Sequence, residues 1–210
     1  MKGVSQPRAF HPEGDVFRHT LLLMKQLKQA STVLAFGCLL HDVGKPATFR
    51  RSDRIRFNGH DRVGARIAED ILTRLRFSND LKEQIVACVD GHMRFKDVQK
   101  MRESTLKKFM QRRTFKTELE QHRMDCLASH GDLSHWRFLR KKIKSLSRDE
   151  IKPPPLLNGR DLLSLGYLEG PKIGQILRAL EEQQLEGMLQ TKEEALEWVR
   201  KKAQSLDVSL

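Results

Sequence analysis

The sequence predicts an all-α fold, and three observations support this class. Apolar residues recur at helical spacing in one segment after another, no sustained strand pattern occurs, and Gly and Pro are sparse inside the periodic segments. The weakest region for a helix is Thr48–Asn58, where the polar, roughly alternating stretch Arg50–Arg56 is expected to form a loop or a short hairpin. We expect a helical bundle followed by a small helical appendage.

The first helix is expected from Asp15 to Gln29, with Asp15 as its N-cap. Ser31 is placed to cap the next helix, Thr32 to about Val43, which is apolar almost all round and should lie in the core. Further periodic stretches predict helices at Asp61–Leu75, Asp80–Asp90, Ser104–Arg113, Phe115–Ala128 and Leu133–Ser145.

The triple proline Pro153–Pro155 is expected to divide the chain. Proline cannot continue a helix, and a run of prolines forms a stiff extended connector. We therefore expect one domain at residues 7–150 and a second, helical domain at residues 151–210.

Three helices are expected in the second domain. A short one begins at about Gly159, and the next begins at Pro171, because proline suits the first position of a helix. Thr191 and Glu194 have the spacing of a capping box and should open a last helix, Lys192–Ser205.

The composition is that of a globular protein, with 39% apolar and 31% charged residues. The longest apolar run, around Val33–Leu40, is far shorter than the ~20 residues that cross a bilayer. The stretch MKGVSQPRAF has no apolar signal core. A cytoplasmic location without a membrane partner is therefore expected.

The three cysteines, Cys38, Cys88 and Cys126, lie far apart, and no Cys-x-x-Cys pair occurs. The sequence thus indicates neither a disulfide framework nor a thiolate zinc site. All three stand in apolar helical segments, so we expect them to be buried packing residues.

The formal net charge of +12 is unevenly distributed. Residues 1–150 hold 31 Lys and Arg against 18 Asp and Glu, whereas residues 151–210 hold 8 against 9. A basic region joined to a neutral one suggests a polyanionic partner, and we favour nucleic acid over a generic cationic surface. The side chains that can place several charges on one helical face, and so bind RNA, are Arg102, Lys107, Lys108, Arg112, Arg113 and Lys116. The alternative is a solvated face that binds nothing.

The pair His41-Asp42 stands at the end of the most apolar predicted helix. A charged carboxylate beside an imidazole is costly in such a place unless a bound cation or a fully satisfied polar network compensates it. A His-Asp pair alone is weak evidence for a metal, so the rest of the pattern decides.

Further candidate ligands follow in order along the chain, each on a different helix or helix end, as in the metal sites of helical bundles. The full set is His19, His41, Asp42, His60, His92 and Asp125. Imidazole and carboxylate without thiolate suit manganese, iron, nickel, cobalt or magnesium better than a structural zinc. One or two divalent ions are expected, and Asp42 is the natural shared ligand if there are two.

This pattern resembles the HD superfamily of metal-dependent phosphohydrolases. The residues that carry the family signature are His19, His41, Asp42 and Asp125, and His60 and His92 match the extra histidines of members that hold two metals. The string HDVGKP is also typical of the family, with Lys45 as the expected phosphate contact.

The resemblance implies a phosphohydrolase or phosphodiesterase that acts on nucleotide or RNA phosphoesters, such as 2′,3′-cyclic phosphates. The side chains expected to take part in catalysis are Asp42, Lys45 and Asp61. Asp61, like Asp90, could instead make a hydrogen bond behind a ligand. His11 is a candidate for substrate contact or for shaping the entry of the first helix. The remaining histidines, His122, His130 and His135, are expected to be structural.

Two longer stretches resemble one branch of that superfamily. QPRAFHPEGDVFRHTLLLM looks like the start of the HD segment in bacterial tRNA nucleotidyltransferases and poly(A) polymerase-like proteins. The stretch from PPPLLNGRDLL to EEALEWVR looks like their C-terminal piece, and together the two span residues 6–200. Those enzymes also need a head with an Asp-x-Asp pair, which does not occur here.

The alternative to a phosphohydrolase is therefore the RNA-binding C-terminal half of such an enzyme, not itself catalytic. Its partners would be RNA, most simply tRNA, and a separate nucleotidyltransferase head.

Overall fold

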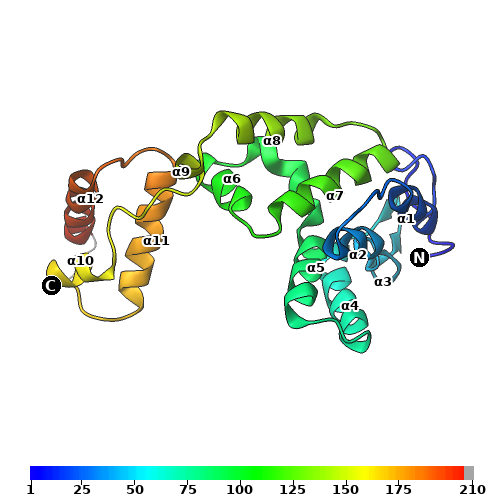
Figure 1. Cartoon of the computed structure of the whole chain (residues 1–210), viewed down its shortest axis with the longest axis horizontal. Helices are drawn as coiled ribbons and strands as arrows, with labels where there is room; N and C mark the ends of the chain where they lie inside the picture. Colours follow the sequence, from blue (N-terminus) through cyan, green and yellow to red (C-terminus); the bar gives the residue numbers. More distant parts are fainter. Residues whose placement is uncertain (206–210) are drawn as a thin grey trace. The chain divides into compact units, whose positions relative to one another are not determined.

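The computed structural model describes residues 1–205, with side chains described through residue 201, and confirms the all-α class in this part of the chain (Figure 1). Its helices are α1 (Val16–Met24), α2 (Thr32–Leu40), α3 (Lys45–Thr48), α4 (His60–Arg74), α5 (Asn79–Gly91), the 3₁₀ helix η1 (His92–Lys100), α6 (Glu103–Met110), α7 (Phe115–Ala128), α8 (Ser134–Ser145), α9 (Arg148–Ile151), α10 (Gly159–Ser164), α11 (Pro171–Leu185) and α12 (Lys192–Ser205). Among the described helices, none has the length and apolar content needed to span a bilayer.

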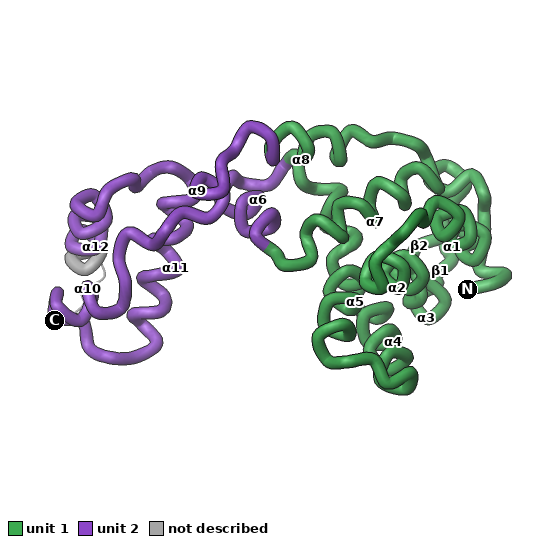
Figure 2. The backbone as a smooth tube through the Cα atoms, viewed as in Figure 1, with its two compact units in different colours: residues 1–99, 112–142 green, residues 100–111, 143–210 purple. Residues whose placement is uncertain are grey.

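The chain divides into two compact units (Figure 2). Unit 1 comprises residues 1–99 and 112–142, and unit 2 comprises residues 100–111 and 143–210. Residues 100–111 and 143–150, which we expected in the first domain, are grouped with unit 2. The reason is the packing of α6, which lies against α9 and α11. Lys107 Nζ also donates to the Leu185 carbonyl at 2.9 Å.

Unit 1 is built around α2, which packs against α1, α5 and α7, while α4 packs on α5 (Figure 1). Its apolar core includes Leu72, Ile85 and Val89, all fully buried. All three cysteines are buried and free, as expected. The site described below lies at one end of this core.

The expected caps of the first two helices are confirmed. Asp15 accepts a hydrogen bond from Arg18 N at 3.0 Å, and Ser31 accepts one from Leu34 N at 3.2 Å. The first helix nevertheless ends at Met24 instead of Gln29. The backbone of Gln29 has a φ of +49°, a left-handed conformation that a right-handed helix cannot include.

The polar stretch Arg50–Arg56 forms a short hairpin, one of the two expected outcomes. Strand β1 (Arg50–Arg51) pairs antiparallel with β2 (Ile55–Arg56), with Arg50 opposite Arg56.

Unit 2 has an apolar core formed by α10, α11 and α12, which includes Leu162, Leu180 and Val199. Helix α11 begins at Pro171, as expected. The capping box at the start of α12 is confirmed, because Glu194 N donates to Thr191 Oγ1 and Thr191 N donates to Glu194 Oε2, both at 3.2 Å.

Candidate metal centre

The six candidate ligands, far apart in the sequence, converge in unit 1 as two adjacent groups. One group is His19, His41 and Asp125, and the other is Asp42, His60 and His92. Within each group the candidate ligand atoms lie within 4.8 Å of one another. All six residues are buried except Asp125, which is half-buried.

Two local features bring the second group together. A Cβ atom at Gly44 would lie 2.1 Å from the His60 carbonyl oxygen, so only glycine allows the turn after Asp42 to approach the start of α4 so closely. In η1, His92, Phe95 and Val98 are buried, and this spacing of three residues matches the three residues per turn of a 3₁₀ helix. The same face therefore holds His92 inward.

Two close contacts, one within the first group and one between the groups, lack hydrogen-bond geometry. His19 Nε2 lies 2.9 Å from Asp125 Oδ1, and His41 Nε2 lies 3.2 Å from Asp42 Oδ2. None of these four buried atoms has a hydrogen-bond partner of ordinary geometry among the described residues. Buried polar atoms are normally satisfied, so this arrangement fits ligand atoms that converge on a cation.

In the second group, two imidazole nitrogens face each other. His60 Nε2 and His92 Nε2 are 3.1 Å apart, and they lie 3.5 Å and 3.9 Å from Asp42 Oδ1. The other nitrogen of each ring has a backbone partner. Nδ1 of His60 contacts the Phe57 carbonyl at 2.8 Å, and Nδ1 of His92 contacts the Val89 carbonyl at 2.6 Å. If Nδ1 donates in both rings, both Nε2 atoms carry lone pairs.

Burial lowers the pKa of His60 and, with the charge of His41, lowers the pKa of His92 to about 4, which favours the neutral form of both rings. With Nδ1 as the donor in both rings, the two Nε2 lone pairs and the carboxylate oxygen would repel one another unless a cation lay between them. A divalent ion fits this donor set of two imidazoles and one carboxylate.

Asp42 stands between the two groups, with Oδ2 near His41 and Oδ1 near His60 and His92. Burial raises the pKa of this carboxyl, but the charges of His41 and Lys45 outweigh burial and hold it well below its usual range. A carboxylate in this position can contact one ion with each oxygen, as we expected for two ions.

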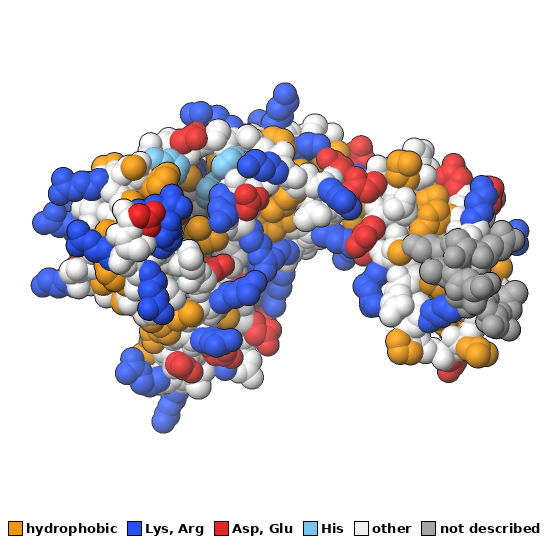
Figure 3. Space-filling model, turned by 180° about the vertical axis from the view of Figure 1, so that it is seen from behind, with side chains coloured by type: hydrophobic (Ala, Val, Ile, Leu, Met, Phe, Trp, Pro, Cys, Tyr) orange, Lys and Arg blue, Asp and Glu red, His pale blue; other side chains and the backbone are white. Residues whose placement is uncertain are grey.

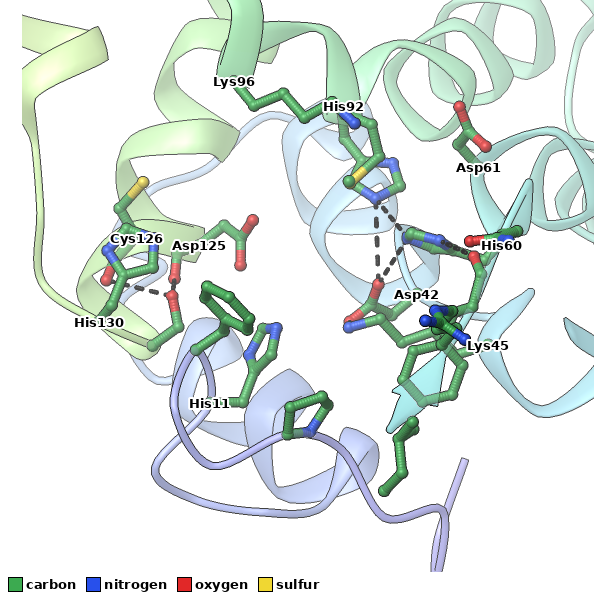
Figure 4. A pocket seen from close by; sticks show the side chains of 18 of the residues that line it. His11, Asp42, Lys45, His60, Asp61, His92, Lys96, Asp125, Cys126 and His130 are labelled. Atoms are coloured by element: carbon green, nitrogen blue, oxygen red, sulfur yellow. Dashed lines mark hydrogen bonds and ion pairs between the residues drawn. The ribbon is translucent and has the colours of Figure 1, made fainter. Parts of the chain in front are cut away.

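Lys45, expected as a phosphate contact, is buried, and its ammonium group is already engaged. Nζ lies 2.7 Å from Asp42 Oδ2 and donates to Gln6 Oε1 at 2.9 Å. Asp61 lines the pocket beside the site but belongs to neither group, and Figure 4 shows its carboxylate apart from them. The catalytic roles expected for these residues stay predictions.

A third set of contacts was missed by the sequence analysis. Glu13 Oε1 lies 2.9 Å from His19 Nδ1 and 3.1 Å from His11 Nδ1, and it accepts a hydrogen bond from Gln6 Nε2 at 3.0 Å. The available signal was a glutamate between a histidine and the first ligand helix, in the string HPEGDVFRH.

A large pocket of about 1410 Å³ opens beside the second group (Figure 4). Its lining includes the cationic residues Lys45, Arg54, Arg56, Arg62 and Lys96. The histidines expected to be structural, His122, His130 and His135, line the same pocket. On the face drawn in Figure 3, histidine side chains gather in a hollow with Lys and Arg around it.

The structure does not place the six expected RNA-binding residues on one helical face. Arg102, Lys107 and Lys108 belong to unit 2, whereas Arg112, Arg113 and Lys116 belong to unit 1. Several of them make internal contacts: Lys108 pairs with Glu181, Arg112 with the buried Glu118, and Arg113 with Asp80. Arg102, Arg113 and Lys116 are the exposed members, and their contact with RNA stays a prediction.

A continuous basic face lies instead on α8, which the sequence analysis did not single out. Within unit 1, Arg137, Arg140 and Lys141 of this helix are exposed and follow the spacing i, i+3 and i+4 of one helical face. The helix contains no acidic residue, and Leu139 is fully buried. The run RFLRKKIK carried this signal.

Comparison with known proteins gives a consistent result. A family model described as "tRNA nucleotidyltransferase domain 2 putative" matches residues 62–199. An A-adding tRNA nucleotidyltransferase from Deinococcus radiodurans is 33% identical over 208 residues, covering 90% of this chain and 47% of that protein. A CC-adding tRNA nucleotidyltransferase from Thermus thermophilus is 35% identical over 190 residues, covering 85% and 43%. The chain thus spans less than half the length of these relatives.

These relatives show that the main functional expectation was wrong. They are nucleotidyltransferases, so a phosphohydrolase or phosphodiesterase is not supported, whereas the narrower resemblance to tRNA nucleotidyltransferases is confirmed. The physical reason lies in what the motif encodes. A His…His-Asp…Asp pattern specifies a set of ligands on a helical scaffold, and one scaffold serves several functions.

Proposed function

The chain belongs to the family of tRNA nucleotidyltransferase domain 2, and on this premise we propose that it is the tRNA-binding part of an enzyme that adds nucleotides to tRNA. The observation that carries the proposal is the extent of the likeness. The matched residues 62–199 run through both units, so the likeness is not confined to the histidine cluster. The relatives' names state which RNA they act on.

The charge of unit 1 supports an RNA partner. Unit 1 holds 25 Lys and Arg against 15 Asp and Glu, whereas unit 2 holds 14 against 12. A cationic surface binds the phosphate backbone and releases counterions, which makes binding depend on salt. The α8 face is the best candidate for this contact, because its cations are exposed and no acidic side chain of the helix neutralises them.

A tRNA titration at several salt concentrations tests the proposal. We expect the wild-type chain to bind tRNA, with affinity falling steeply as salt rises. The variant Arg137→Gln/Lys141→Gln should weaken binding and reduce the slope of log affinity against log salt by about 0.9 for each phosphate that the variant no longer neutralises. The control Arg66→Gln/Arg74→Gln removes the same charge from exposed positions of α4.

Absence of tRNA binding at low salt would overturn the proposal. Equal weakening in the two double variants would place the RNA contact elsewhere than on α8, and Arg102, Arg113 and Lys116 would be the next positions to substitute.

The metal centre forms the second part of the proposal. We infer that His19, His41, Asp42, His60, His92 and Asp125 hold one or two divalent ions of manganese, iron, nickel, cobalt or magnesium. When bound, such ions supply concentrated positive charge next to the cation-lined pocket.

Metal analysis of the purified chain checks this part. Wild-type protein should retain one or two ions per chain, and Asp42→Asn should lose them because the Asp42 carboxylate lies next to His41 of the first group as well as to His60 and His92 of its own group. Asp53→Asn replaces an exposed aspartate and should retain the wild-type content. If the wild-type chain neither retains an ion nor takes up an added one, the proposed metal centre is overturned. The proposal that the chain binds tRNA is then unaffected.

Nucleotide addition is assigned to a separate head, either a further part of the same enzyme or a partner, because the sequence has no Asp-x-Asp pair. The chain alone should therefore incorporate no labelled ATP or CTP into tRNA. Incorporation by the purified chain would contradict this assignment. The proposed role also places the protein in the cytoplasm.

A further inference from the structure

The β1–β2 hairpin carries a cluster of arginines with no assigned role. Its sequence, RRSDRIR, holds four arginines against one aspartate. Arg50, Arg51 and Arg54 are exposed, and none of the three pairs with a carboxylate among the described residues. The fourth, Arg56, is neutralised by Asp53, whose carboxylate accepts from both terminal nitrogens of the guanidinium at 2.8 and 3.0 Å. Three cations of the hairpin therefore remain free to bind an anionic partner.

The stability of the fold does not explain this cluster. Antiparallel pairing sets Arg50 directly opposite Arg56, and like charges in that position destabilise a hairpin. Asp53 offsets only one of the two charges. The sheet has only two strands, and such a sheet is marginally stable by itself. A partner that carries negative charge would compensate the remaining arginines.

The hairpin is held beside the large pocket by Phe57, which follows β2 directly. The centroid of its ring lies 5.8 Å from that of Phe49 and 6.4 Å from that of His60, and the Lys45 ammonium group lies 5.4 Å from it. Lys45 and His60 lie on the same side of the pocket (Figure 4). Phe57 and Arg54 both line the pocket, so a ligand that enters it meets the hairpin.

The same pocket offers an exposed aromatic ring. Phe10 lines it and is 62% exposed, although a phenylalanine gains free energy by burial. A nucleic-acid base stacks on such a ring only when the base is unpaired and splayed out of its helix. The volume of about 1410 Å³ exceeds the ~300–1,000 Å³ usual for small-ligand pockets. The space therefore suits a short stretch of polymer better than one small molecule.

We propose that the hairpin and Phe10 bind an unpaired stretch of RNA, with Arg50 and Arg54 on its phosphates and Phe10 stacked on a base. The inference rests on the proposed tRNA-binding role and names the part of the RNA that this surface takes. Duplex RNA would meet the arginines but would offer no free base to the ring. The two contacts also differ in their response to salt, because phosphate neutralisation releases counterions whereas stacking does not.

The test measures binding of a labelled single-stranded RNA of about ten nucleotides, and of a duplex containing the same strand, at several salt concentrations. Arg50→Gln/Arg54→Gln should weaken binding of the single strand by at least about fivefold at low salt. It should also reduce the slope of log affinity against log salt by about 0.7 for each phosphate no longer neutralised. The control Arg66→Gln/Arg74→Gln removes the same charge from exposed positions of α4 and should bind as the wild type does. Loss of Arg50 relieves a like-charge pair, so the hairpin variant should fold.

Phe10→Ala should weaken binding of the single strand by about 5- to 100-fold without changing the salt slope. Its control is Phe17→Ala, which removes a partly exposed phenylalanine of α1 that does not line the pocket. Wild-type affinity in Phe10→Ala would overturn the stacking contact. A hairpin variant within twofold of wild type, or a duplex bound as tightly as the single strand, would overturn the proposal.

The two proposals fail separately. A wild-type chain that binds no tRNA at low salt overturns the tRNA-binding role, whereas the labelled single strand tests the hairpin without tRNA. A wild-type chain that binds tRNA but not the single strand overturns the role of the hairpin alone. The same conclusion follows if Arg50→Gln/Arg54→Gln binds tRNA with wild-type affinity and salt slope.

Discussion

The two units of this chain are stabilised by different kinds of core. Unit 2 buries leucines, a phenylalanine, a methionine, an alanine and a valine, and among the described side chains Ser104 is its one buried polar residue. Unit 1 buries four histidines, an aspartate, a lysine and a glutamate beside its apolar core. Buried ionisable groups are costly unless they are compensated, so unit 1 requires a bound ion or polar contacts to compensate them. Unit 2 buries no ionisable side chain among those described. The difference indicates where function lies: the unit that departs from simple apolar packing carries the candidate site.

The largest expected effect tests the apolar core of unit 2. Leu162→Ala should lower the free energy of unfolding by about 2–5 kcal/mol, because it leaves a cavity at a fully buried position. Denaturant unfolding measures the decrease. Leu168→Ala, at a position 84% exposed, should change stability by less than about 0.5 kcal/mol. Metal content should be the same in both, since neither residue lies in unit 1.

Addition of Mn²⁺ tests the need of unit 1 for a cation. At a concentration about 100 times its Kd, the ion should raise the free energy of unfolding of unit 1 by about 2.7 kcal/mol, because it binds only the folded state. Native-state hydrogen exchange should show added protection in α1, α4 and α7, and none in α11 and α12. Equal protection of both units, or of neither, would contradict the contrast between them.

Gly44→Ala should affect stability and metal affinity together. The added Cβ would stand 2.1 Å from the His60 carbonyl oxygen and 2.5 Å from Gly64 N, so backbone atoms must move. We expect a decrease of about 1–3 kcal/mol in stability and weaker Mn²⁺ binding, since the turn carrying Asp42 shifts away from His60. Gly159→Ala in unit 2 meets only Ile173 at 3.8 Å and should be tolerated. A Gly44→Ala protein with unchanged affinity would show that this close approach does not position Asp42.

The smallest expected effect is the loss of a helix N-cap in unit 2. Asn158 caps α10 by accepting hydrogen bonds from Arg160 N and Asp161 N. Asn158→Ala should cost about 1 kcal/mol in a thermal unfolding experiment, whereas Asn158→Asp retains the acceptor and should cost little. Metal affinity is expected to stay at the wild-type value in both variants.

Local signals in the sequence predicted much of this fold, because their physics acts over a few residues. The Asp15 and Ser31 caps, the Pro171 start of α11 and the Thr191 capping box stand where the sequence indicated. The end of the first helix was missed, because it stops at Met24 and Gln29 has a left-handed backbone conformation. The RNA-binding residues illustrate a second limit, since Lys108 and Arg113 make ion pairs with residues remote in sequence.

The sequence by itself determined the all-α class and the resemblance to tRNA nucleotidyltransferases, because helical periodicity and residue order are properties of the chain. Only the tertiary structure decided how the candidate ligands are arranged: two groups on either side of Asp42, Lys45 turned toward Asp42, and Glu13 beside His19. Such contacts join residues from separate helices and loops. Their distances follow from how the helices pack, and no spacing along the chain encodes them.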